Sequence, residues 1–234
     1  SVVEAVHHAA ANAEAEAELH WIDTEEIHTT EAAAKALAKV DAVIVPGGFG
    51  SRGIDGKLAI IQHCRENELP YLGICYGMQL ACVEFLRNVV GKADAHTTEI
   101  DEATPDPVIT ILENQKDIKD LGGTLRLGSY PAEVKADSRI ATLYGAAKEV
   151  HERHRHRYEV NPKYHAVLQE QGLTISGISP DGRLAEFIEL EHHPYFVATQ
   201  AHPELKSGLT EPAPLFCGLV TAALRRTDSP TREA

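Results

Sequence analysis

One stretch of the chain places a reactive side chain between two glycines: Leu72-Gly-Ile-Cys-Tyr-Gly-Met-Gln79. An apolar run precedes the G-x-C-x-G pattern and a helix-compatible run follows it, which is typical of a nucleophile elbow, a sharp turn from strand to helix. At a helix N-terminus, backbone N–H groups and the helix dipole favour the thiolate form of a cysteine. Such patterns also recur by chance. The stretch alone therefore leaves two interpretations of Cys75, a nucleophile or a buried cysteine in a tight turn.

Strand and helix patterns alternate on both sides of this stretch. The first half of the chain predicts helices at 1–17, 30–39, 57–67 and 76–87, and strands at 20–22, 41–45 and 70–74. The second half predicts strands at 108–112, 124–127, 132–134, 173–179, 184–190 and 195–199, a short helix or loop at 138–143, and helices at 164–171 and 214–225. Alternating strands and helices with doubly apolar strands indicate a parallel sheet between helices. We expect one α/β domain with an antiparallel elaboration in its C-terminal half.

The composition excludes several classes of protein. A net charge of -13, from 35 acidic and 22 basic residues, argues against non-specific nucleic-acid binding and is compatible with a halophile's salt-rich cytoplasm. No apolar run approaches the roughly 20 residues of a membrane span. Three of the four cysteines, Cys64, Cys82 and Cys217, lie in apolar helical patterns, and none forms a C-x-x-C pair. We expect no disulfide framework and no metal site, and a reducing cytoplasmic location.

A cysteine nucleophile needs a base and an orienting partner for that base. His202 stands out among 13 histidines because it follows the predicted strand 195–199 and precedes Glu204 by two residues. In extended backbone around Pro203, residues two apart project to the same side, so Glu204 could fix the imidazole tautomer. The other interpretation is a surface H-P-E loop.

A glycine-rich turn, Pro46-Gly-Gly-Phe-Gly50, ends another buried strand. Ligands of open α/β sheets bind beyond the carboxyl ends of strands. The Gly48 N–H is therefore a candidate oxyanion donor beside the N–H of Tyr76. The alternatives are a turn that needs glycine only for its backbone, or a phosphate-binding loop, which the missing G-K-[ST] ending disfavours.

Taken together, these three elements resemble the class I (triad) glutamine amidotransferases, and within them the glutaminase domains of CTP synthase. The distinguishing segments are Pro46–Gly53, Cys82-Val-Glu-Phe-Leu-Arg-Asn88, Gln115-Lys-Asp117, Gly122–Gly128, His154-Arg-His-Arg-Tyr-Glu-Val-Asn161 and Gln200–Glu204. The resemblance covers residues 1 to about 224. It implies a flavodoxin-like three-layer sandwich with a mainly parallel central sheet. It also implies that residues 1–226 form the glutaminase domain without its expected first strand, that 227–234 form a polar tail, and that a synthetase domain lies outside this chain.

The resemblance also implies roles for individual residues. Cys75 attacks the glutamine amide to form a γ-glutamyl thioester, His202 moves protons, Glu204 orients it, and the N–H groups of Gly48 and Tyr76 form the oxyanion hole. Further positions match those that hold glutamine in the family: Gly48, Phe49, Tyr76, Gly77, Met78, Gln79, Glu99 and Arg157. Arg52 and Gly53 form a candidate GTP-effector segment, although Asp55 stands where the family usually has Glu.

Cofactors and partners are likewise implied by the resemblance. No cofactor is expected in this chain. ATP and Mg would bind the absent synthetase domain, which aminates UTP to CTP, and GTP would act as an activator. We expect L-glutamine and the synthetase domain as partners, no nucleic acid and no membrane, a monomeric fragment and a homotetrameric full enzyme.

Two other functions are alternatives to that of a CTP synthase glutaminase domain. An amidotransferase domain could serve another synthetase, such as one for GMP or carbamoyl phosphate, but the H-R-H-R-Y-E-V-N segment speaks against that. A catalytically silent regulatory or scaffold domain is disfavoured by the intact Cys, His and Glu. The His-Arg segment itself could bind metal, phosphate or nucleic acid. We favour four charged donors that brace a substrate loop, because no acidic or Cys partner has metal-ligand spacing.

Overall fold

The structure, a computed structural model, describes residues 1–111 and 125–227. Its helices are α1 (Val2–Asn12), α2 (Thr30–Leu37), α3 (Ile54–Glu66), α4 (Tyr76–Asn88), α6 (Arg139–Leu143), α7 (His165–Glu170) and α8 (Pro214–Thr227), with 3-10 turns η1 (Thr24–Glu26), η2 (Pro162–Tyr164) and η3 (Pro203–Leu205). Its strands are β1 (Val43–Val45), β2 (Tyr71–Ile74), β3 (Ala95–Thr97), β4 (Asp106–Thr110), β5 (Arg126–Val134), β6 (Glu149–His156), β7 (Glu159–Val160), β8 (Leu173–Ile178), β9 (Ala185–Leu190) and β10 (Phe196–Thr199).

The main sheet is mixed. Within the described residues its strand order is β1-β2-β10-β9-β8-β5-β6. The strands β1, β2 and β10 run parallel, and every further pairing, from β10 with β9 to β5 with β6, is antiparallel. The α/β class is therefore confirmed, with its parallel part limited to three neighbouring strands and its antiparallel elaboration larger than expected. A small second sheet joins β3, β4 and β7.

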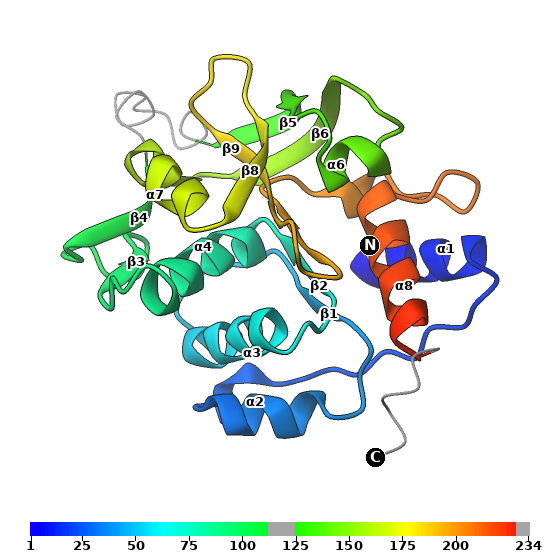
Figure 1. The fold of residues 1–234 in the computed structure, drawn as a ribbon, viewed down its shortest axis with the longest axis horizontal. Helices are drawn as coiled ribbons and strands as arrows, with labels where there is room; N and C mark the ends of the chain where they lie inside the picture. Colours follow the sequence, from blue (N-terminus) through cyan, green and yellow to red (C-terminus); the bar gives the residue numbers. More distant parts are fainter. Residues whose placement is uncertain (112–124, 228–234) are drawn as a thin grey trace.

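Helices cover both faces of the parallel strands, so the layers are those of a sandwich. In Figure 1, α2, α3 and α4 lie on one side of β1 and β2, and α1 and α8 lie on the other. Strand β2 shows why: it is buried throughout, and its alternating side chains divide between two cores. Tyr71 packs in the core beneath α3 and α4, whereas Leu72 and Ile74 pack in the core beneath α1 and α8.

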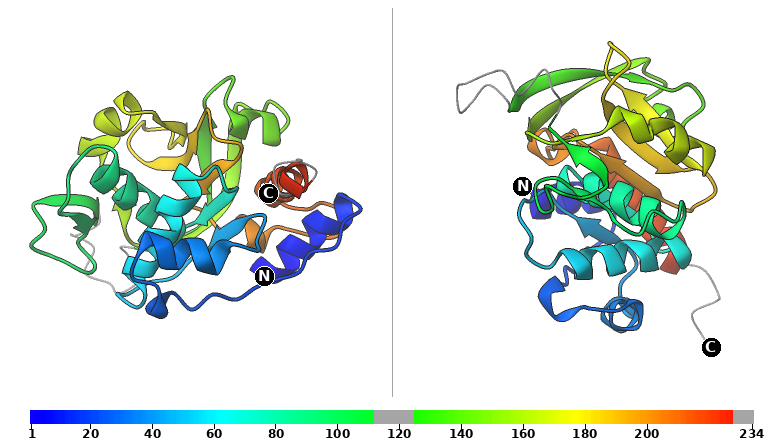
Figure 2. Two further views of the ribbon diagram at one scale, coloured as in Figure 1. Left: turned by 60° about the horizontal axis from the view of Figure 1, so that its bottom comes forward. Right: turned by 90° about the vertical axis from the view of Figure 1, so that its left-hand side faces the viewer.

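The antiparallel half extends the sheet beyond its three parallel strands. In the right-hand view of Figure 2, the ribbon of β5 and β6 lies at the far end of the molecule from α2. The residues of β6 alternate strictly between exposed and buried. None of the helices among the described residues is both long and apolar enough to cross a membrane.

Several expected boundaries differ from the structure. The first helix ends at Asn12, where Ala13 caps it and Glu14 adopts a positive φ of 52°. The two strands expected at 124–127 and 132–134 form the single strand β5, because β6 pairs with it over its whole length. Residues 20–22 form no strand, since no described strand pairs with them. The segment 115–117, the turn at 122–123 and residues 228–234 of the expected tail lie outside the described residues, and Thr227, the first residue of that tail, ends α8.

Candidate active site

Cys75 forms the sharp turn between β2 and α4. Its φ of 51° and ψ of -99° are rare for a residue with a side chain and indicate a strained backbone. The flanking glycines permit the turn: a Cβ at Gly73 would lie 2.8 Å from the Ala198 Cβ, and one at Gly77 would lie 2.1 Å from the carbonyl oxygen of Val45. The Cys75 N–H donates to the Thr199 carbonyl at 2.7 Å, which ties the elbow to the end of β10.

His202 and Glu204 follow β10 and contact each other directly. The His202 Nδ1 lies 2.7 Å from the Glu204 Oε1. The extended backbone expected for 202–204 is not found, because Pro203 begins the 3-10 turn η3, which carries Glu204. The His202 N–H donates to the Arg153 carbonyl of β6 at 2.7 Å, so the antiparallel ribbon also positions this residue.

The electrostatics of His202 favour its protonated form. Burial alone would lower its pKa, but the hydrogen bonds to Cys75 and Glu204 and the negative charges of both partners raise the pKa to about 10. At neutral pH the arrangement therefore pairs an imidazolium of His202 with the Cys75 side chain. Cys75 is only 5% exposed, which limits the access of water to that pair.

The glycine turn after β1 lies against both of these side chains. A Cβ built at Gly47 would lie 2.7 Å from the His202 Cε1 and 3.6 Å from the Cys75 Cβ. A Cβ at Gly48 would meet only the Tyr76 ring, at 3.6 Å. The carboxyl ends of the three parallel strands thus bring the glycine turn, the elbow and the H-P-E segment to one place, as open α/β sheets do with their ligand sites.

Gln79 is buried at the end of the first turn of α4. Its Nε2 donates to the Tyr158 carbonyl at 3.0 Å and to the Gln200 Oε1 at 3.2 Å. The Gln200 Nε2 in turn lies 3.6 Å from the Cys75 Sγ. Gln200 was not predicted as a site residue, and its only signal in the sequence is its place two residues before His202.

The other residues expected to hold a ligand surround the same turn. Glu99 accepts the Gly50 N–H at 3.0 Å, and the Tyr76 hydroxyl donates to the Gly50 carbonyl at 2.7 Å. Phe49 is 86% exposed, and Arg157 is exposed at the bend after β6. Met78 is fully buried in the core beneath α3 and α4. The Cys75 side chain packs in the other core, beneath α1 and α8.

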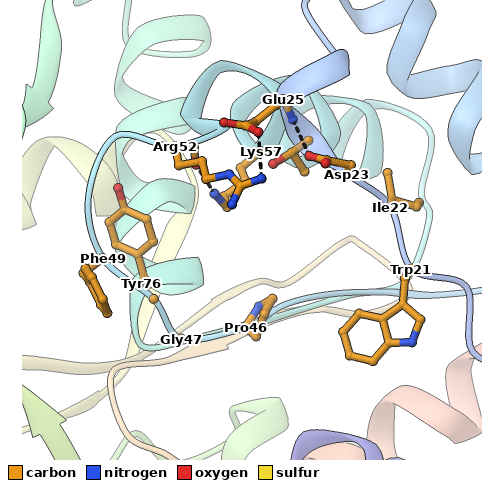
Figure 3. Close-up of a pocket in the computed structure, with 12 residues that line it drawn as sticks. Trp21, Ile22, Asp23, Glu25, Pro46, Gly47, Phe49, Arg52, Lys57 and Tyr76 are labelled. Carbon is orange, nitrogen blue, oxygen red and sulfur yellow. Dashed lines mark hydrogen bonds and ion pairs between the residues drawn. The ribbon is translucent and has the colours of Figure 1, made fainter.

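A cavity of about 540 Å³ opens beside the glycine turn. Phe49 and Tyr76 line one side of it and Trp21 lies on the other (Figure 3). Arg52 borders the cavity and forms an ion pair of 2.8 Å with Glu25. Gly53, at the start of α3, has a positive φ of 62°, and a Cβ there would collide with the Thr24 hydroxyl at 2.2 Å.

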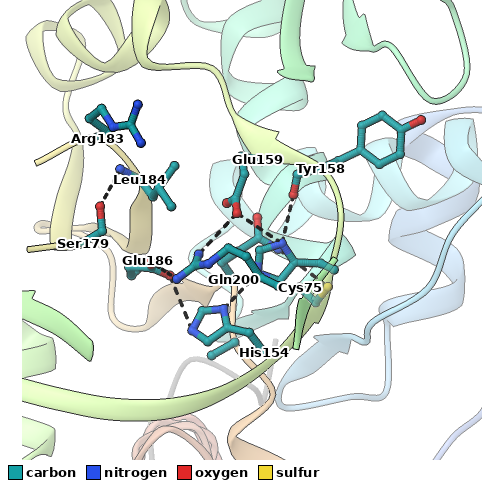
Figure 4. A network of polar contacts seen from close by, with 12 residues as sticks. Cys75, His154, Tyr158, Glu159, Ser179, Arg183, Leu184, Glu186 and Gln200 are labelled. Atoms are coloured by element: carbon teal, nitrogen blue, oxygen red, sulfur yellow. Dashed lines mark hydrogen bonds and ion pairs between the residues drawn. The ribbon is translucent and has the colours of Figure 1, made fainter. Parts of the chain in front are cut away.

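A buried ionic network lies behind the elbow, as Figure 4 shows. Arg126 lies 2.8 Å from Glu186 and 3.3 Å from Glu159. Burial raises the pKa of Glu159 to about 8, and burial lowers the pKa values of His154 and His156 to about 2 and 3. The expectation of four charged donors in the His-Arg segment is therefore wrong for its two histidines, which are buried and neutral. No group of three or more potential metal ligands occurs in 1–111 and 125–227.

Comparisons with known proteins agree with this geometry. The family description "Glutamine amidotransferase class-I" matches residues 1–222. CTP synthase of Methanocaldococcus jannaschii is 52% identical over 229 residues, and that of Prochlorococcus marinus is 51% identical over 234; these matches cover 96% and 100% of the chain. In each case the chain spans 42% of the relative's length.

Solved structures give the same result at the level of the domain. The acivicin-bound glutaminase domain of Trypanosoma brucei CTPS superimposes with a TM-score of 0.90 at 36% identity, over 96% of this chain and 87% of that one. A putative GMP synthase subunit from Thermoplasma acidophilum matches with a TM-score of 0.56 at 15% identity over 85% of this chain and 80% of that one, which shows the shared fold alone. The chain therefore belongs to the class I glutamine amidotransferase family, among the glutaminase domains of CTP synthase.

Proposed function

We propose that this domain hydrolyses the side-chain amide of L-glutamine, with Cys75 as nucleophile, His202 as the proton-transfer group and Glu204 as its orienting partner. One observation carries the proposal. The imidazole that Glu204 holds at 2.7 Å and the Cys75 Cβ both lie against the same glycine, Gly47. A nucleophile, a base and an orienting group in hydrogen-bond reach form the constellation of acyl-transfer enzymes.

The reaction follows from these positions. The Cys75 thiolate attacks the amide carbon, and the N–H groups of Gly48 and Tyr76 stabilise the resulting oxyanion. The His202 imidazolium gives its proton to the amide nitrogen, ammonia leaves, and a γ-glutamyl thioester remains. The neutral imidazole then takes a proton from a water molecule that attacks the thioester. Glutamate and the thiolate are released, and the imidazolium is restored.

We propose that the α-groups of glutamine are held by opposite charges. A zwitterionic amino acid needs an anion for its ammonium and a cation for its carboxylate, and Glu99 and Arg157 supply them. The Gln79 Nε2 is held by the Tyr158 carbonyl and Gln200, so its Oε1 is the atom that accepts from the ammonium. Phe49 packs against the substrate stem, and the backbone of Gly77 and Met78 borders the site.

We further propose that the ammonia serves amination of UTP in a synthetase domain, which uses ATP and Mg, as the name CTP synthase of the relatives suggests. This rests on the relatives, of which the chain spans less than half. Arg52 and Gly53 are the proposed segment for activation by GTP. We expect the whole enzyme to be a cytoplasmic homotetramer and this chain alone to be a monomer.

We also propose that a further strand pairs with β1 at the edge of the sheet. A groove of about 570 Å³ supports this, because residues 15–22 line one side of it, residues 40–46 line the other, and α1 and α8 border it. A longer chain that carries this strand should melt at a higher temperature than the present one, with slower hydrogen exchange at residues 20–22. Unchanged melting and exchange would contradict the proposal.

The proposed reaction is tested by labelling with 6-diazo-5-oxo-L-norleucine followed by peptide mapping. The adduct is expected on Cys75, because burial raises the pKa of Cys82 to about 12 and that of Cys64 further, and both stay thiols. An adduct on Cys217, or on one of these two, would refute the site. In the protein joined to its synthetase partner, Cys75→Ala should abolish CTP formation from glutamine and leave formation from free ammonia intact.

A further inference from the structure

A row of buried amides connects Cys75 to the segment that carries Arg157. Gln200 is fully buried and Gln79 is 3% exposed. The row runs from the Tyr158 carbonyl through the Gln79 carboxamide to the Gln200 carboxamide and ends at the Cys75 sulfur. Figure 4 shows Gln200 beside Cys75, with Tyr158 on the same side of the network.

One backbone group fixes the direction of every hydrogen bond in this row. The Tyr158 carbonyl can only accept, so the atom of Gln79 that lies 3.0 Å from it must be the NH₂ group. The same nitrogen lies 3.2 Å from Gln200, which must therefore present its oxygen. Both hydrogens of the Gln79 amide are then used, and the NH₂ of Gln200 is left to face the Cys75 Sγ at 3.6 Å.

A second row ends at the same carbonyl and agrees with this polarity. The His156 Nδ1 lies 3.1 Å from the Tyr158 oxygen, and its Nε2 lies 2.8 Å from the His154 Nδ1. Since both rings are neutral, His156 carries its proton on Nδ1, and His154 donates from its own Nδ1. The carbonyl oxygen has two lone pairs, so it accepts from His156 and Gln79 together.

We propose that Gln200 is a catalytic residue that donates its N–H to the Cys75 thiolate, in a direction imposed by the Tyr158 carbonyl through Gln79. The inference rests on the proposed glutaminase reaction, in which this sulfur is the nucleophile. A donor on the sulfur favours the thiolate over the thiol, since hydrogen bonds to ionised groups are stronger than neutral ones. The row also joins the nucleophile to the segment of Arg157, so that a ligand held there is coupled to the sulfur.

The test is alkylation of Cys75 by iodoacetamide as a function of pH, followed by peptide mass spectrometry. Iodoacetamide lacks the α-groups of glutamine, so the rate reports the thiolate and not substrate binding. Gln200→Leu keeps the volume and removes the donor. Its alkylation profile should move to higher pH by about one unit, a tenfold loss of thiolate at neutral pH, as expected for one hydrogen bond to a charged group.

Two further variants separate the hydrogen bond from a structural role. Gln200→Glu places a carboxylate oxygen against the sulfur, so its shift should exceed that of Gln200→Leu. Gln79→Leu leaves the Gln200 carboxamide free to turn, so its alkylation profile should shift less than that of Gln200→Leu or Gln200→Glu. Circular dichroism identifies the folded variants. If Gln200→Leu fails to fold, the shifts of the alkylation profiles of Gln79→Leu and Gln200→Glu can still be compared with each other.

A profile of folded Gln200→Leu or Gln200→Glu that stays within about 0.2 units of wild type would overturn the proposal, and so would a shift of Gln79→Leu larger than that of Gln200→Glu. Failure of the proposed function gives a different result. In that case 6-diazo-5-oxo-L-norleucine does not label Cys75 in the wild-type chain, whatever the alkylation profile.

Discussion

The replacement Gly47→Ala tests the arrangement of the nucleophile and base most directly. The new Cβ would lie 2.7 Å from the His202 Cε1, so the imidazole must retreat by about 0.7 Å to reach ordinary contact at 3.4 Å. The ring cannot do so freely, because its Nδ1 is held at 2.7 Å by Glu204. A displacement on the order of 1 Å in a catalytic group costs about 10²-fold in rate, or about 2.7 kcal/mol of barrier.

Gly48→Ala is the matched control. Its Cβ would meet only the Tyr76 Cδ1, at 3.6 Å, and neither Gly47 nor Gly48 has a positive φ. The variant also keeps the backbone N–H that we assign to the oxyanion. We expect the rate of Cys75 labelling by 6-diazo-5-oxo-L-norleucine to fall about 10²-fold in Gly47→Ala and to stay within about threefold in Gly48→Ala.

Urea unfolding shows whether the effect passes through the imidazole. Overpacking by one methyl group costs about 1 kcal/mol or somewhat more of unfolding free energy. This loss should disappear when Gly47→Ala is combined with His202→Ala, because no ring then opposes the methyl group. Labelling of folded Gly47→Ala at the wild-type rate, or equal losses of stability with and without the imidazole, would refute the geometry.

Three further predictions follow from charge and packing. Glu204→Gln removes the carboxylate that helps to hold the pKa of His202 near 10. The labelling rate of Cys75 should therefore fall about tenfold or more at pH 7, and the pH profile of labelling should be displaced. An unchanged pH profile would contradict this role of Glu204. Stability should be greatest near pH 6.5. The two buried histidines of β6 resist protonation in the folded state, so their contribution to the free energy of unfolding is lost as pH falls below that value. Glu159, with a pKa of about 8, acts in the opposite direction, and its contribution to the free energy of unfolding is lost as pH rises from about 4.5 through 8. In urea titrations, the free energy of unfolding of Glu159→Gln should decrease less steeply above pH 6.5 than that of the wild type. Gly77→Ala forces a Cβ against a β1 carbonyl at 2.1 Å and should destabilise the fold by about 3 kcal/mol or more, whereas Gly208→Ala, with no atom nearer than 4.0 Å, should change unfolding by less than about 0.5 kcal/mol.

The parts of the site that follow strand ends could be predicted from the sequence. Three apolar runs end in the glycine turn, in Cys75 and in the segment of His202, and parallel strands bring their carboxyl ends to one edge. The strand type and the order of the strands along the chain suffice for this prediction. They predict the neighbourhood of the triad without any side-chain coordinates.

Residues whose role depends on non-local packing could not be predicted in this way. Gln200 contacts Cys75 only because β10 lies beside β2, and its amide direction depends on a carbonyl 42 positions earlier in the chain. The partners of Arg126 come from β7 and β9, far away in sequence. The alternation of His and Arg at the end of β6 did contain a signal: period two predicts one buried and one exposed face, and His154 and His156 occupy the buried face.

The antiparallel half is more than a cover for the parallel strands, because its backbone orients both reacting groups. The Arg153 carbonyl of β6 fixes the His202 N–H at 2.7 Å, and the Tyr158 carbonyl fixes the direction of the amides that reach Cys75. Carbonyl groups keep their polarity under any change of protonation, so they are suitable anchors beside a site that moves protons. A ligand or partner that shifts the segment 153–158 would therefore act on the base and the nucleophile together. The parallel core, which holds the elbow itself, would not have to move.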